Sequence, residues 1–221
     1  MTKLYKEEAR CSVCGAQNAF TGIGSTNAVG SPDLDTRPPE MERSTIFAWV
    51  QRCPNCGYCA SDVSVTRSGA QKVMNSKEYR DQLNDPTYPE LANSFLCKAI
   101  VDCESKDFAA AAWAFIHAAW VCDDSHHPDH AIACRMNATN MFKIAEDHGQ
   151  QVTDQNDAST AILVDLLRRS GQIEQAKTVI VERRQQIAED VIVSILDFQN
   201  ALIEKNDLYR HTIAEALGEE D

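Results

Sequence analysis

The sequence lacks the segments expected of an exported or membrane-embedded chain. Residues 1–10 are polar and charged, so the apolar core of a secretory signal peptide is missing. No apolar run approaches the roughly 20 residues that a membrane-spanning helix needs. We therefore expect a cytoplasmic protein that makes no membrane contact. In that reducing compartment, paired cysteines bind metal more often than they form disulfides.

Signatures of catalysis and of nucleic-acid binding are also missing. The chain has no phosphate-cradling glycine loop, no dinucleotide-binding fingerprint and no nucleophile with a recognisable base partner. Residues 81–221 carry 11 Lys and Arg against 25 Asp and Glu, a balance of −14, whereas residues 1–80 carry 10 against 8. Because acidic surfaces repel phosphate backbones, nucleic acid is not an expected partner. These absences favour a role other than that of an enzyme.

Cysteine, by contrast, is abundant, with nine residues, and four of them are paired. Residues 11–15 and 53–57 each form a Cys-x2-Cys-Gly knuckle, a turn that directs two thiolates toward one ion. Two knuckles complete the four-thiolate shell of a structural zinc site, and iron is the alternative occupant of such a shell. The predicted ligands of one structural Zn²⁺ ion are Cys11, Cys14, Cys53 and Cys56.

The segment around the two knuckles predicts a small β-structured zinc ribbon over residues 1–80. Strands are expected at residues 16–23 and 45–52, with a short further strand where Val63 and Val65 alternate with polar residues. The interval between the knuckles is longer than usual and requires an extended loop, which the prolines place near residues 30–39. Its charged side chains either pair with one another or offer carboxylates to a cation or to acid–base chemistry. They are Asp33, Asp35, Arg37, Glu40, Glu42 and Arg43.

From about Pro89 onward the apolar spacing predicts helices throughout residues 81–221. A first helix ends at a break over residues 105–107, and a third begins at Pro128 and runs to about residue 148. After a linker at residues 149–157, two helices are split at residues 170–171, and a last region extends to a short closing helix within residues 208–217. The side chains predicted to face inward in that last region are Val191, Ile195, Phe198 and Leu202.

Two of the predicted hairpins share a local template. Residues 106–111 and 171–176 both resemble the turn and second helix of a tetratricopeptide repeat, although they lie farther apart in the sequence than successive repeats would. An irregular helical bundle is the alternative. The predicted fold is therefore mainly α, a ribbon followed by tetratricopeptide-like hairpins. Such hairpins would offer a groove to a protein or peptide partner.

Three further groups of residues are open to two interpretations each. Cys59 either joins Cys53 and Cys56 in part of an iron–sulfur binding run or packs beside the ribbon site. The indole and phenyl rings at 113, 115 and 120 are expected in the core, with a ligand box as the alternative. A second cluster either binds another metal ion or forms a polar loop before a capped helix. It consists of Cys122, His126, His127, His130 and Cys134.

The stretch Arg-Cys-Pro-Asn-Cys-Gly-Tyr at residues 52–58, with the acidic, proline-containing loop before it, resembles a family of uncharacterised bacterial proteins. This domain-of-unknown-function family has an N-terminal zinc-ribbon-like module and C-terminal tetratricopeptide-like helices. The resemblance implies the same four metal ligands and brings no activity with it. A non-enzymatic adaptor is the first hypothesis. A redox or iron protein, and a metalloenzyme built on the second cluster, are the alternatives.

Overall fold

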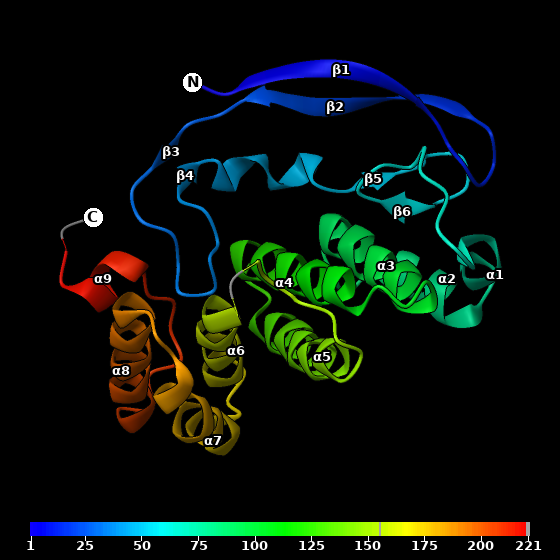
Figure 1. Ribbon diagram of the computed structural model, residues 1–221. Helices are drawn as coiled ribbons and strands as arrows, with labels where there is room; N and C mark the ends of the chain where they lie inside the picture. The colour runs from blue at the N-terminus through cyan, green and yellow to red at the C-terminus, as the bar shows by residue number, and fades with distance from the viewer. Residues whose placement is uncertain (155, 220–221) are drawn as a thin grey trace.

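The computed structural model describes residues 1–154 and 156–219, and it begins with a long antiparallel hairpin. Strand β1 (Lys3–Arg10) pairs with β2 (Gln17–Ser25), and the first knuckle joins them. The hairpin arches over the helices, with its turn beside β5 and β6 (Figure 1). The predicted strand at residues 16–23 is confirmed as β2. Strand β1 was not predicted because its exposed, charged residues resemble a terminal tail.

Short elements connect this hairpin to the second knuckle. Strands β3 (Ala28–Val29) and β4 (Glu40–Met41) pair and bracket the predicted loop, and the 3₁₀ helix η1 (Arg43–Ala48) follows. Strands β5 (Gln51–Arg52) and β6 (Cys59–Ala60) pair around the second knuckle. Helices α1 (Ala70–Met74) and α2 (Lys77–Leu83) complete this part.

The other two predicted strands are mostly wrong. Of residues 45–52, only Gln51–Arg52 form a strand, β5. Residues 45–48 belong to η1, where the Thr45 hydroxyl donates to the carbonyl of Glu42 and accepts from the Trp49 indole. These side-chain bonds stabilise a helical turn in a segment rich in β-branched and aromatic residues. Residues 63–65 also form no strand. The Val63 backbone N–H donates to the Gln51 side chain rather than to a neighbouring strand.

The remainder of the chain is helical, so the prediction of a mainly α protein is confirmed. The helices are α3 (Glu90–Glu104), α4 (Phe108–Asp124), α5 (Pro128–Asp147), α6 (Asn156–Arg169), α7 (Ile173–Arg183), α8 (Asp190–Glu204) and α9 (Ile213–Leu217), with a 3₁₀ turn η2 (Arg184–Gln186) after α7. The predicted breaks fall where expected: Asp107 caps α4 and Pro128 is the first residue of α5. Val191 was wrongly predicted to face inward, since it is 51% exposed.

Two apolar clusters form the core. The first runs from the second knuckle into α3, α4 and α5, and joins Tyr58 and Val63 to Phe95 and Trp120. The second lies among α6, α7 and α8, and Leu34 of the inter-knuckle loop is buried in it. Both clusters therefore contain residues from both sides of residue 80. Two independent domains, at 1–80 and 81–221, stay a prediction.

An aromatic group connects η1 to the first helices. The His117 ring lies 5.1 Å from Trp49, 5.2 Å from Phe95 and 5.0 Å from Trp120, measured between ring centroids. Trp113 lies 5.8 Å away on the same helix. The predicted core role is confirmed for Trp120, which is buried, whereas Trp113 and Phe115 are partly buried and pack against the core. Within the described residues, no helix combines the length and apolar character needed to cross a membrane.

Candidate metal centre

The two knuckles adopt the same backbone turn. In each, the glycine N–H donates to the carbonyl of the first cysteine at 2.8 Å, and the glycine has a positive φ, +75° at Gly15 and +79° at Gly57. Few L-residues adopt this left-handed conformation, which explains a glycine directly after each second cysteine. The turn is so tight that both thiols project to the same side.

The four sulfur atoms form one compact cluster. Cys11 Sγ lies 3.7 Å from Cys56 Sγ, and Cys14 Sγ lies 3.7 Å from Cys53 Sγ. All four sulfurs lie within 4.8 Å of one another. In a tetrahedral site with metal–sulfur bonds of about 2.3 Å, neighbouring sulfurs are about 3.8 Å apart. The four predicted cysteines are therefore brought together at the spacing of a tetrahedral shell and can hold a metal ion.

The surroundings of the cluster favour the thiolate of Cys14, whereas burial raises the pKa of the Cys56 thiol. The side-chain amide of Asn55 donates to Cys14 Sγ at 3.5 Å, and that of Asn18 donates to Cys53 Sγ at 3.8 Å. A backbone N–H at Ala16, with the Asn55 amide, lowers the pKa of the Cys14 thiol to about 6. Burial raises the pKa of Cys11 instead. The exposed Cys14 and the buried Cys53 show that the cluster sits at the surface with one side closed.

Cys59 lies outside this cluster. Its Sγ donates to the Gly57 carbonyl at 3.4 Å, its backbone N–H donates to Tyr79 Oη at 3.1 Å, and its thiol contacts Cys97 of α3. It belongs to β6 and is fully buried. The iron–sulfur interpretation, which needs this third thiol beside Cys53 and Cys56, is therefore not supported by the geometry.

The second predicted cluster does not assemble. Cys122 and Cys134 face each other in the core, whereas His126 is exposed and the His130 ring packs on Tyr88 at 4.1 Å. His127 lies 5.7 Å from His130, centroid to centroid. In the part of the chain that the structure describes, only the four ribbon cysteines gather as a metal-ligating group of three or more. A short turn between α4 and α5 describes this segment better than a metal site, although the predicted cap is missing: His127, at the N-cap of α5, makes no capping side-chain bond.

The inter-knuckle loop is held by buried ion pairs, as one of its two interpretations proposed. Arg43 Nη2 contacts Asp33 Oδ1 at 2.7 Å within the loop. Asp35 is fully buried, accepts from the Trp120 indole at 2.8 Å, and contacts Arg169 of α6 at 3.2 Å. The sequence did not predict these partners on α4 and α6, because residues so far apart in sequence leave no local pattern.

Fold and site together define a mainly α protein with an N-terminal four-cysteine cluster able to hold a metal ion. The chain matches a family model described as "Uncharacterized protein conserved in bacteria (DUF2225)" over residues 4–191. The chain therefore belongs to this bacterial family, as its second knuckle suggested. No curated protein and no solved structure matches it.

Proposed function

We propose that the protein is a non-enzymatic zinc-binding protein whose four-cysteine site holds one structural Zn²⁺ ion. The observation that carries the proposal is the pair of 3.7 Å sulfur–sulfur distances across the two knuckles. Four thiolates at tetrahedral spacing make a closed shell with no position left for a substrate, and closed four-cysteine shells are typical of structural zinc. Iron also accepts four thiolates and remains the alternative.

The ion would connect the hairpin to the rest of the fold. An isolated two-stranded hairpin is at best marginally stable in water. Cys11 and Cys14 belong to the turn of that hairpin, whereas Cys53 and Cys56 belong to the turn between β5 and β6, beside the helices. A metal ion bound by both turns would fix one end of the hairpin through coordination bonds, and metal binding would contribute directly to folding.

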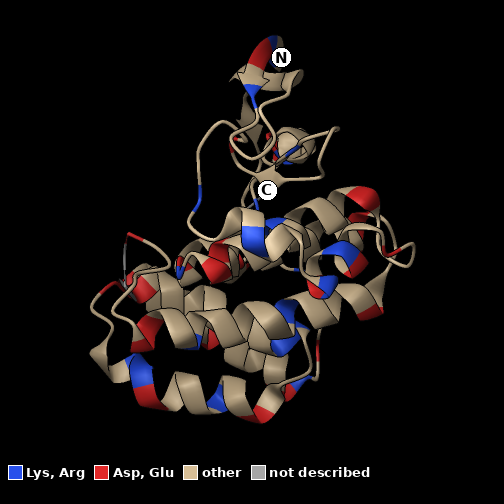
Figure 2. Cartoon of the chain, turned by 90° about the vertical axis from the view of Figure 1, so that its right-hand side faces the viewer, with Lys and Arg blue, Asp and Glu red and all other residues tan. Residues whose placement is uncertain are grey.

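The helical part is the surface proposed for a partner protein. The α3–α4 and α6–α7 hairpins are the two that resemble tetratricopeptide repeats, and repeats of this kind bind peptides and proteins along stacked helices. Figure 2 shows Asp and Glu residues spread over many helices. With a balance of −14 over residues 81–221, this surface favours a partner with a basic face.

Elemental analysis of the purified, untagged protein tests the metal assignment. We expect one zinc per chain, lost in Cys53→Ser and kept in Cys103→Ser, a matched change at a half-buried cysteine of α3 outside the cluster. Stoichiometric iron with a visible absorption band would instead identify a redox or iron protein. Two metal ions per chain would revive the metalloenzyme hypothesis.

A separate measurement tests the partner. Cross-linking in cells followed by mass spectrometry is expected to join lysines of residues 81–221 to a protein with a basic surface. Recombinant copies of that protein should bind with an affinity that falls as salt rises. Cross-links confined to the hairpin would contradict a helical docking surface.

A further inference from the structure

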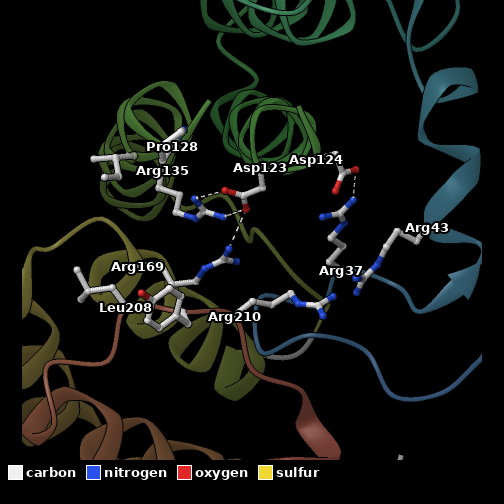
Figure 3. A pocket seen from close by; sticks show the side chains of 11 residues that line it. Arg37, Arg43, Asp123, Asp124, Pro128, Arg135, Arg169, Leu208 and Arg210 are labelled. Atoms are coloured by element: carbon white, nitrogen blue, oxygen red, sulfur yellow. Dashed lines mark hydrogen bonds and ion pairs between the residues drawn. The ribbon is translucent and has the colours of Figure 1, made fainter. Parts of the chain in front are cut away.

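A cavity away from the cysteine cluster is lined by arginines. Its volume is about 450 Å³, within the range of small-molecule sites. It lies between the inter-knuckle loop, the ends of α4, α5 and α6, and the segment before α9 (Figure 3). Five of the twelve arginines of this acidic protein line it, and no lysine does. They are Arg37, Arg43, Arg135, Arg169 and Arg210.

The carboxylates beside these arginines do not balance them. Arg37 pairs with Asp124, Arg135 and Arg169 share Asp123, and Arg43 and Arg210 share Asp33, while Asp35 is a second partner of Arg169. Five guanidinium groups thus face four carboxylates. Asp165, also near Arg169, bonds more closely to the buried Arg168, at 2.6 Å. The cavity keeps a net positive charge in a chain of net charge −12.

Several donors of these arginines are unused. The buried Nε groups of Arg37 and Arg135 have no hydrogen-bond partner among the described residues. Arg210 is half exposed, and its Nη1 lies 3.6 Å from Asp33 Oδ1, too long for a hydrogen bond. Burial and the nearby Asp35 raise the pKa of the Asp33 carboxyl, whose closer partner is Arg43, at 2.7 Å. The guanidinium of Arg210 is therefore available to a ligand.

The side of the cavity away from Arg37 and Arg43 includes apolar residues, beside Arg135 and Arg169. In Figure 3, Pro128 and Leu208 lie on one side of the space and Arg37 and Arg43 on the other. Tyr209, which is 81% exposed, stands at the rim. A ligand that fits both walls carries an anionic group at one end and an apolar body at the other. Guanidinium forks bind phosphoryl oxygens through paired hydrogen bonds, which several arginines around one space can supply together.

We propose that this cavity binds a small phosphate monoester, with the phosphoryl group among Arg37, Arg43 and Arg210 and the apolar part against Pro128 and Leu208. The site is separate from the proposed zinc function and does not depend on it. It requires neither a reaction nor a metal ion.

Isothermal titration calorimetry of the full, metal-loaded chain with phenyl phosphate, inorganic phosphate and benzoate tests the proposal. We expect saturable 1:1 binding of phenyl phosphate, at least about tenfold tighter than inorganic phosphate or benzoate. Arg210→Gln should weaken phenyl phosphate at least about tenfold, since it removes a charge-assisted contact. Arg184→Gln, at a comparably exposed arginine paired with Asp197, should leave the affinity within about twofold.

Two further variants keep the test independent of folding. Arg210→Lys retains the charge without the fork and should fall between wild type and Arg210→Gln. Leu208→Ala should weaken phenyl phosphate but not inorganic phosphate. Absence of saturable phenyl phosphate binding, equal losses in the Arg210 and Arg184 variants, or equal or tighter binding of inorganic phosphate or benzoate would each overturn the proposal.

Discussion

Asp35 is the residue whose replacement tests the buried ion-pair network most directly. Its carboxylate is fully buried and joins three segments: it accepts from the Trp120 indole of α4 at 2.8 Å, from Arg169 of α6 at 3.2 Å, and from the backbone N–H of Arg37 at 3.3 Å. Asp35→Asn keeps the shape but removes the charge. It also turns an amide N–H₂ toward groups that are themselves donors.

The expected cost is about 3 kcal/mol of unfolding free energy. Breaking one partner of a buried ion pair costs about 3–5 kcal/mol, because the other charge stays buried. The lower end of this range applies because Arg169, which is only 8% exposed, retains its ion pair with Asp123, at 2.8 Å. An exposed pair offers the matched control. Asp197→Asn removes the charge that pairs with Arg184. Because the Asp197 side chain is 55% exposed and that of Arg184 is 43% exposed, the change should cost less than about 1 kcal/mol.

Urea denaturation of both variants, with metal saturated and pH held at 7, measures the two costs. A loss below about 1 kcal/mol in Asp35→Asn, or equal losses in the two variants, would refute the importance assigned to the network. Combining Asp35→Asn with Arg169→Met removes the charge that the first change leaves unpaired. The double variant should therefore lose less stability than the two single variants added together.

Two smaller predictions use the knuckles and the buried histidine. Gly57→Ala should lower the melting temperature more than Gly15→Ala. Both glycines have positive φ, so the backbone strain is similar. A Cβ at Gly57 would lie 2.5 Å from the Leu83 side chain, whereas a Cβ at Gly15 meets only the flexible Arg10 side chain, at 3.6 Å. Equal melting temperatures would contradict this packing. Burial lowers the pKa of His117 to about 3. As the pH falls, this histidine is protonated in the unfolded chain before it is protonated in the folded one. The free energy of unfolding therefore decreases below about pH 6.5, the pKa of histidine in the unfolded chain. His117→Phe should reduce the loss of unfolding free energy between pH 7 and pH 5, and His148→Phe, at an exposed histidine, should leave it unchanged.

Local signals explain which parts of the fold could be predicted from the sequence. The knuckles, the start of α5 at Pro128 and the break before α4 are each specified by a few adjacent residues, and all were found. β1 carries no comparable signal, because six of its eight residues are exposed. η1 was mistaken for a strand because Thr45 and Ile46 favour strands locally, whereas their burial and side-chain bonds are set by the surrounding fold.

The arginine cavity could not be predicted from any local sequence signal. Its partners lie far apart in the sequence, 134 residues for Arg169 and Asp35 and more for Arg210 and Asp33, and only the folded chain brings them together. The charge balance of residues 81–221 is strongly acidic, and in the sequence it argued against binding of phosphate groups by this part of the chain. A charge balance averaged over the whole of that part conceals a few arginines that converge on one space.

The length of the inter-knuckle loop, which the ribbon alone does not require, has a structural explanation in the same network. The knuckle sulfurs come within 3.7 Å of one another, so a much shorter connection would be enough to join the two knuckles. The loop instead reaches the C-terminal segment: Leu34 N–H donates to the His211 carbonyl at 3.0 Å, and Ile213 N–H donates to the Pro32 carbonyl at 2.9 Å. The same loop supplies Asp35 to α4 and α6. It therefore ties the metal-binding end of the molecule to α9, and it brings Arg37 into the same cavity as Arg210, which lies beyond the residues that match the family.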